Sequence, residues 1–206
     1  MEIHPPHGPI HSWQELAVQL ATITAGILIA LSLDGVREWR HERALVREAR
    51  ENLSREIAAN LKEVDGENKT VAARQAKVDA LLAVVEDAMA RKPSNVHQID
   101  IGANIADLNA AGWQTAERMG ALAHMDYGEV QRYSKLYSYQ QLFADQQHRT
   151  VEHAIAAITA ATGDPFSVPI RDLEILRERL RQLRADLLVE EQFGTRLSEE
   201  YRKVLP

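Results

Sequence analysis

An uncharged and mainly apolar stretch, LAVQLATITAGILIALSL, runs from residue 16 to residue 33, with Glu15 and Asp34 at its two ends. As a helix it is about 27 Å long, just enough to cross a hydrocarbon core of about 30 Å. The stretch is apolar on every side, a pattern typical of a helix surrounded by lipid. We therefore predict one transmembrane helix over residues 13–34, preceded by an irregular tail over residues 1–12.

Two other interpretations of this stretch exist. A cleaved signal peptide needs a basic start and a small-residue cleavage site, whereas residues 1–12 contain no Lys or Arg. A buried core helix is the stronger alternative, because polar side chains such as Gln19 and Ser32 dilute the hydrophobicity. Thr22, Gly26 and Ala30 place small side chains on one face, and such rows let helices approach closely in lipid. Ala and Gly are, however, also common in membrane helices without this role.

Beyond residue 35 the apolar positions recur every three or four residues, which is the pattern of amphipathic helices. Asp65-Gly66 is expected to end the first of these helices, since glycine readily takes the left-handed conformation that closes a helix. Lys92-Pro93 is expected to end the second. Three further helices are predicted, over about residues 105–122, over 127–162 and from Pro169 onward. Because no alternating strand pattern appears, we predict that residues 35–206 form an all-α helical bundle domain into which the transmembrane helix continues.

The last predicted helix has the most regular pattern. Its leucines alternate at spacings of three and four, which is typical of a coiled-coil seam. These residues are Leu173, Leu176, Leu180, Leu183 and Leu187. Glu190 and Gly194 interrupt the repeat before Leu197 resumes it. The seam has two possible partners, another helix of the same bundle or a helix of a second subunit.

Charge places limits on location and partners. The chain has 24 Lys and Arg against 30 Asp and Glu, so it lacks the basic balance of a nucleic-acid-binding domain. No Lys or Arg precedes the predicted span, whereas five arginines follow it between Arg37 and Arg50, so the positive-inside rule places the bundle in the cytoplasm. Interleaved glutamates also suit a salt-bridged helix surface, which leaves a periplasmic bundle as the alternative. The chain has no cysteine, which excludes disulfides and thiolate chemistry.

Two sets of residues are weak candidates for a metal site. Asp145, His148 and Glu152 share one predicted helical face, but bundle metal sites draw ligands from several helices, so a solvated polar face is the favoured interpretation. The tail histidines at spacings of three and four are expected to be solvated as well. They are His4, His7 and His11. No cofactor is expected.

The aromatic residues offer a possible ligand pocket. Tyr133 and Tyr137 share a face of the fourth predicted helix, and Trp113 lies beside Gly112 on the third. Packing in the core, with the hydroxyls at its rim, is favoured over a pocket between helices. No phosphate-binding loop, nucleophile elbow or pair of catalytic carboxylates is present, so we do not expect an enzyme.

Four segments carry a resemblance to a known family: GILIALSLD at the end of the span, REWRHER after it, then LNAAGWQTAERMGALAHM and DYGEVQRYSKLY. In these segments the chain resembles an uncharacterised family of bacterial single-pass membrane proteins with a helical domain of unknown function. The resemblance implies a bacterial inner-membrane location and supplies no catalytic residues.

These observations favour a membrane-anchored helical interaction module, acting as a scaffold, regulator or accessory subunit through a protein partner or self-association. One alternative is a sensory domain that binds a small ligand between its helices, near Tyr133 and Trp113. A less favoured one is a membrane-tethered metal-dependent enzyme centred on His148 and Glu152.

Overall fold

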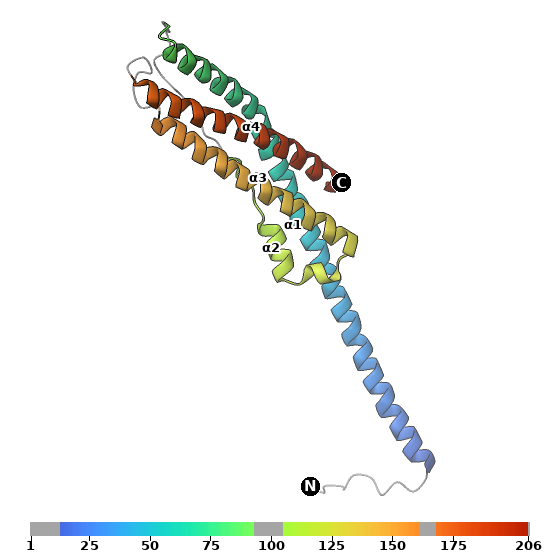
Figure 1. The fold of residues 1–206 in the computed structure, drawn as a ribbon. Coiled ribbons are helices and arrows are strands. Elements are labelled where there is room, and N and C mark those ends of the chain that lie inside the picture. Colours follow the sequence, from blue (N-terminus) through green and yellow to red (C-terminus); the bar gives the residue numbers. More distant parts are fainter. Residues whose placement is uncertain (1–12, 93–104, 161–167, 206) are drawn as a thin grey trace, which may run out of the picture. The chain divides into compact units, whose positions relative to one another are not determined.

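The computed structural model describes residues 13–92, 105–160 and 168–205, and these residues form helices and their connections with no strand. The helices are α1 (Trp13–Met89), α2 (Ala111–Arg118), the 3-10 helix η1 (Ala121–His124), α3 (Tyr127–Ala160) and α4 (Ile170–Val204) (Figure 1). The predicted all-α fold is thereby confirmed. The chain divides into two compact units, residues 1–47 and residues 48–206. The predicted domain limits, 13–34 and 35–206, remain a prediction.

The expected break at Asp65-Gly66 is wrong, because α1 runs through both residues to Met89. Gly66 is exposed and meets nothing within 4 Å, and a glycine inside a helix costs only about 1 kcal/mol relative to alanine. Val64 and Val71 on either side are fully buried, and this burial outweighs the glycine. Asp65 is held by Arg202 of α4 at 2.7 Å.

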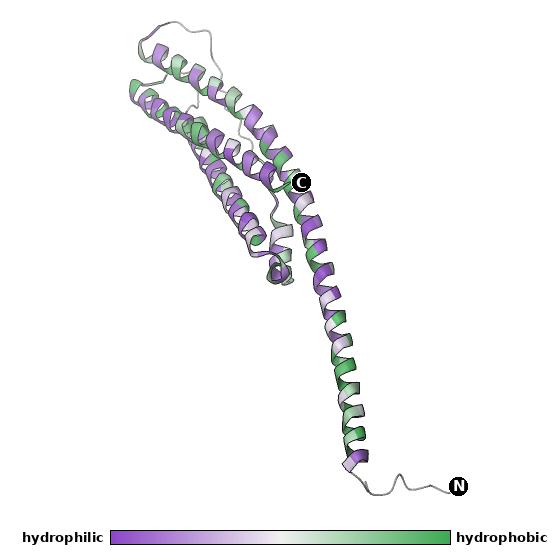
Figure 2. Cartoon of the chain, turned by 90° about the vertical axis from the view of Figure 1, so that its right-hand side faces the viewer, coloured by the Kyte–Doolittle hydropathy of each residue, from purple (hydrophilic) through white to green (hydrophobic). Residues whose placement is uncertain are grey.

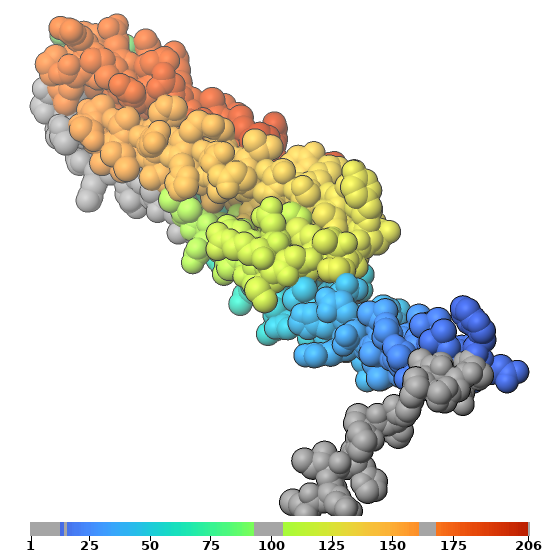
Figure 3. Space-filling model, turned by 90° about the horizontal axis from the view of Figure 1, so that it is seen from below, coloured from blue at the N-terminus to red at the C-terminus, as the bar shows by residue number. Residues whose placement is uncertain are grey.

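The third predicted helix is shorter than expected. Residues 105–110 are not helical, and α2 begins after Asn109, whose side-chain oxygen accepts a hydrogen bond from the Ala111 amide at 2.8 Å. It ends before Gly120, which has a φ of 76°. Glycine adopts this left-handed backbone conformation without the strain that a side chain would bring. The chain then turns through η1 into α3, and α2 and η1 lie beside the start of α3 (Figure 3).

Three long segments form the bundle: residues 48–89 of α1, helix α3 and helix α4. Helix α4 runs antiparallel to α1, because Arg202 pairs with Asp65 whereas Arg184 pairs with Asp79. Helix α3 runs parallel to α1, since Glu129 meets Arg50 and Gln140 meets Asn60. Each helix buries side chains at alternating spacings of three and four residues. On α1 these include Ile57, Asn60, Val64, Glu67, Val71, Arg74, Val78, Leu81 and Val85.

The five seam leucines of α4 lie inside this bundle. They are between 0% and 3% exposed. Their core cluster also contains Val78, Leu81, Val85 and Ala88 of α1 and Ala154 and Ala157 of α3. The seam is therefore used within the chain, which answers the question that the spacing left open.

Candidate functional site

The first half of α1 is apolar and uncovered. One helix in the described part of the chain is long and apolar enough to span a membrane, and Figure 2 shows its apolar residues in green. None of its most apolar window is buried. Ile23 is 55% exposed and Leu28 58%. The Thr22 hydroxyl donates to the Val18 carbonyl at 2.9 Å, and the Ser32 hydroxyl to that of Leu28 at 2.7 Å. These bonds satisfy the two hydroxyl donors within the helix itself, so they need no water.

The small-residue row of this segment is exposed in the part of the chain that the structure describes. Thr22, Gly26 and Ala30 are exposed, and a Cβ added at Gly26 would find nothing within 4 Å. The row is free to pack against a second helix, and its role in helix packing remains a prediction.

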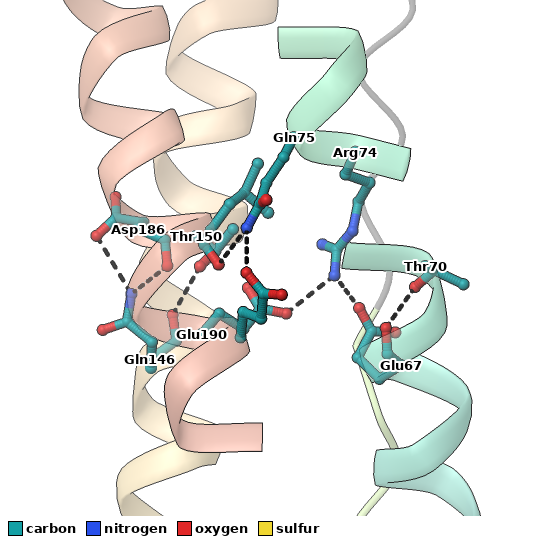
Figure 4. Close-up of polar contacts among 10 residues, drawn as sticks. Glu67, Thr70, Arg74, Gln75, Gln146, Thr150, Asp186 and Glu190 are labelled. Carbon is teal, nitrogen blue, oxygen red and sulfur yellow. Dashed lines mark hydrogen bonds and ion pairs between the residues drawn. The ribbon is translucent and has the colours of Figure 1, made fainter. Parts of the chain in front are cut away.

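The middle of the bundle contains buried charges. Arg74 of α1 lies between Glu67, two turns earlier on the same helix, and Glu190 of α4 (Figure 4). Its Nη2 is 2.9 Å from Glu190 Oε1 and also contacts Glu67 Oε1. Arg74 is 9% exposed, Glu67 3% and Glu190 0%. We call these three residues the buried charge triad.

Further polar side chains surround the buried charge triad. Gln75 donates to Glu191 Oε2 at 3.0 Å, and Gln146 of α3 donates to the Asp186 side chain at 3.2 Å. Gln147 is 1% exposed, and neither atom of its amide has a hydrogen-bond partner. Three more buried polar atoms within the described residues also lack one: Asn68 Oδ1, Arg74 Nε and Glu190 Oε2. The middle of the bundle thus holds more polar groups than its own hydrogen bonds satisfy.

Gly194 allows α4 to come close to its neighbours beside the buried charge triad. A Cβ at this position would lie 3.1 Å from Phe143 Cε2 of α3 and would overlap the Asn68 side chain of α1. The break in the leucine pattern at Gly194 is therefore a packing requirement.

A second polar layer lies nearer the start of the bundle. Asn60 donates to the Asn109 carbonyl at 2.7 Å and to Gln140 Oε1 at 3.2 Å. The Tyr201 hydroxyl donates to the same Gln140 oxygen at 2.7 Å. Burial raises the pKa of Tyr201 above its ordinary value, so the hydroxyl stays protonated as a donor. Three long helices and the segment before α2 are joined through this layer.

The aromatic residues pack against one another. The Trp113 ring is stacked on Tyr137 with centroids 5.3 Å apart, and Tyr133 lies 6.5 Å away. The Tyr137 hydroxyl donates to Glu56 Oε1 at 2.6 Å, and the Gly112 amide donates to Glu56 Oε2 at 2.7 Å. Burial and the bond to Glu56 raise the pKa of Tyr137. This cluster attaches α2 to α1 and α3, as the packing interpretation expects.

The candidate metal ligands are not gathered into a site. Asp145, His148 and Glu152 are exposed on α3, and Asp145 accepts a hydrogen bond from Gln141 at 2.8 Å. Among the residues that the structure describes, no group of three His, Asp or Glu side chains is placed to hold a metal ion. The tail histidines lie outside the described residues.

Sequence reasoning missed the buried charge triad. Glu67 and Arg74 look like surface residues by type, and Glu190 looks like an interruption of the leucine pattern. The signal was the spacing: positions 60, 64, 67, 71, 74 and 78 continue the same alternation of three and four through the polar residues.

Comparisons of the chain with protein-family models, with curated proteins and with solved structures found no match.

Proposed function

We propose that this chain is a single-pass membrane protein whose helical bundle acts by contact with other proteins, as a scaffold, regulator or accessory subunit. The carrying observation is the uncovered apolar half of α1. Fully burying one Leu or Ile side chain is worth about 1.5–3 kcal/mol. This helix exposes such residues on every turn. A helix of this kind is stable where lipid replaces water.

The structure of the bundle supports a contact role over a catalytic one. Buried polar layers at single seam positions specify which helices pair and in which register, at a cost in stability. The interior of the bundle contains such polar layers. Some apolar side chains lie on its outside, among them Ile155 and Ile158 on α3, which are 56% and 43% exposed. Exposed apolar residues one turn apart offer a protein partner a place to pack.

The alternatives have less support. A ligand site near Trp113 and Tyr133 would compete with the stack on Tyr137 and its bond to Glu56. A metal-dependent enzyme at His148 and Glu152 would need ligands from a second helix. We further propose the bacterial inner membrane as the location, with the bundle in the cytoplasm, from the family resemblance and from the arginines after the span.

Fractionation tests the membrane assignment. Wild-type protein is expected to stay with membranes through alkaline carbonate extraction. Leu28→Arg places a charge at the middle of the span, where it costs about 2.5–3.5 kcal/mol, and should shift protein to the supernatant. Leu188→Arg, at a residue that is 39% exposed on α4, is the matched control and should remain in the membrane fraction. Recovery of wild-type protein in the aqueous fraction would contradict the assignment.

Two measurements test sidedness and contact. A reporter fused after residue 206 that is active only in the periplasm should be silent. A photo-crosslinking residue at Ile155 or Ile158 in intact cells should give a discrete adduct, whereas the same residue at exposed Ser138 should not. Recovery of uncrosslinked monomer at every position would contradict the interaction role.

A further inference from the structure

Charges of opposite sign lie on opposite faces of α1 just after the span. Successive helical residues are about 100° apart, which places the four arginines of this segment within an arc of about 120°. The three acidic residues lie within an arc of about 80° on the other side. The basic set, which we call the arginine face, is Arg37, Arg40, Arg43 and Arg47, and the acidic set is Asp34, Glu38 and Glu42. All four arginines are exposed.

This arrangement makes like charges neighbours. Residues three or four apart touch on a helix surface, so Arg40 adjoins Arg37 and Arg43, and Arg43 adjoins Arg47. At such spacings the arginine face has two acidic neighbours, Asp34 beside Arg37 and Glu51 beside Arg47. Neighbouring like charges destabilise a helix that lacks counter-charges. Arg40 and Arg43 have no acidic residue at these spacings, so the centre of the arginine face is open to negative charge from outside the helix.

The bundle treats its arginines differently. Arg196 pairs with Glu200 at 2.9 Å, four residues along α4, and Arg184 pairs with Asp79 at 2.5 Å. Where arginines are neighbours on α4, as Arg177 and Arg181 are, both lie near the Glu86 carboxylate of α1, at 3.7 and 3.5 Å.

We propose that the arginine face binds the phosphates of anionic lipids in the leaflet next to the span. Counted from Leu33 at about 1.5 Å per residue, Arg37 lies about 6 Å and Arg40 about 10 Å beyond the hydrocarbon edge, within side-chain reach of the headgroups. Arg43 and Arg47 lie about 15 Å and about 21 Å beyond that edge, in the aqueous layer over the headgroups. Long arginine side chains extend toward the interface and bind phosphate through two parallel hydrogen bonds. The inference rests on the proposed membrane location.

Trp39 adds a second observation at the same depth. The Arg43 guanidinium lies 4.0 Å from the centre of the Trp39 ring, and the ring itself is 49% exposed. Indole rings favour the headgroup level of a bilayer, and a guanidinium on the ring face keeps its edges available for phosphate. An aromatic ring and four arginines together match an anionic membrane surface better than an acidic protein, which has no need of the interfacial ring.

Energy transfer from Trp39 tests the proposal. Full-length protein with Trp13→Phe and Trp113→Phe is reconstituted into vesicles of phosphatidylcholine and phosphatidylglycerol, and the pyrene-labelled acyl chain is placed on one lipid or the other at equal mole fraction. Energy transfer to pyrene on phosphatidylglycerol should exceed transfer to pyrene on phosphatidylcholine about fivefold. This is the enrichment of anionic lipid expected from one basic residue close to the membrane surface. The preference should fall at high salt, because screening weakens exposed charges.

Two variants complete the test. Changing all four residues of the arginine face to Gln should bring the two labels to parity, whereas the matched change Glu38→Gln with Glu42→Gln should preserve the preference. Native mass spectrometry of protein with all three tryptophans intact should show phosphatidylglycerol retained by the wild type and lost from the arginine variant.

The failures are distinguishable. Equal transfer to both labels in the wild type would overturn lipid selectivity while leaving membrane insertion intact. No transfer to either label would overturn the membrane location itself. A preference that survives in the arginine variant would overturn the assignment to these four residues, and binding of a soluble acidic protein in place of lipid would identify the other class of partner.

Discussion

The two halves of α1 depart from the usual placement of residue types in different ways. Between residues 16 and 33 apolar side chains are outside, as at Leu28, which is 58% exposed. Between residues 53 and 88 apolar side chains such as Ile57 are buried as usual, but Glu67 and Arg74 are buried with them, at 3% and 9% exposure. Burial in this second half follows position along the helix repeat, and residue type predicts burial only where type and position agree.

In each half a different interaction offsets the cost of the unusual placement. Buried charges are tolerated where they are paired and hydrogen-bonded, as Arg74 is with Glu67 and Glu190. Exposed apolar surface is tolerated where the solvent is itself apolar. The comparison therefore predicts that the two halves respond oppositely to the same kind of substitution.

The largest effect is expected from breaking the buried charge triad. Arg74→Ala leaves two carboxylates buried without their guanidinium, and losing one partner of a buried pair costs about 3–5 kcal/mol of unfolding free energy. The measurement is urea unfolding of the full-length protein in detergent micelles, followed by Trp113 fluorescence with Trp13 and Trp39 changed to Phe.

A matched control separates lost charge pairing from lost packing. Glu67→Leu, Arg74→Leu and Glu190→Leu together remove all three charges and extend the apolar seam, so stability should return to the wild-type value or exceed it. If Arg74→Ala unfolds at the wild-type urea concentration, the triad does not support the bundle.

The next effect contrasts the same kind of deletion at a buried and at an exposed position. Leu180→Ala removes a fully buried side chain from the leucine seam and should cost about 2–5 kcal/mol. Ile27→Ala removes a similar volume from the span, where the residue is 56% exposed, and should leave the unfolding of the bundle within about 0.5 kcal/mol of wild type. Equal losses in the two variants, by the same urea assay, would mean that the span is part of the folded core.

How far the sequence predicted the fold follows from these same residues. Leu173 to Leu187 were identified as a seam because apolar type and heptad spacing agreed, and the structure buries all five leucines. Where type and spacing disagreed, at Glu67, Arg74 and Glu190, type was followed and the buried charge triad was missed. The break at Gly66 was wrong for a related reason, since a local glycine preference is smaller than the packing of the residues around it.

Other features were beyond a single-helix pattern. The Trp113–Tyr137 stack was expected as packing, but Glu56, which holds both Tyr137 and the Gly112 amide, lies far away in sequence. The start of α3 is similar: the Glu129 amide donates to Asp126 Oδ1 at 3.0 Å, a local contact, whereas the Glu129 side chain reaches across to Arg50 at 2.7 Å. Such long-range partners follow from how the helices meet, which periodicity on one helix does not contain.

A smaller effect is expected at the aromatic cluster, with a dependence on pH. Tyr137→Phe removes the hydroxyl bond to Glu56 and should cost about 1–3 kcal/mol near neutral pH, since hydrogen bonds to charged groups are worth this much. Burial raises the pKa of Tyr137 in the folded protein, whereas tyrosine in the unfolded chain titrates near pH 10. The wild-type bundle should therefore keep full stability below about pH 10 and lose it progressively as the pH rises further.

Comparison of the variant with the wild type at alkaline pH isolates this residue. The Phe variant should lose less stability between about pH 9 and pH 11, because one tyrosine with a raised pKa is gone. Tyr201, whose pKa is also raised, remains and keeps part of the slope. Parallel pH profiles for the two proteins would show that Tyr137 ionises as freely in the bundle as in the unfolded chain.

The smallest effect on unfolding free energy is expected from an exposed ion pair, in contrast to the buried charge triad. Arg184 and Asp79 join α4 to α1 at 2.5 Å, with side chains 45% and 50% exposed. This pair has the same chemistry as Arg74 and Glu190, but water already solvates both of its members. Arg184→Gln should therefore cost less than about 1 kcal/mol, and added salt should reduce even that difference. A loss as large as that of Arg74→Ala in the urea assay would mean that geometry alone, and not burial, sets the worth of an ion pair in this bundle.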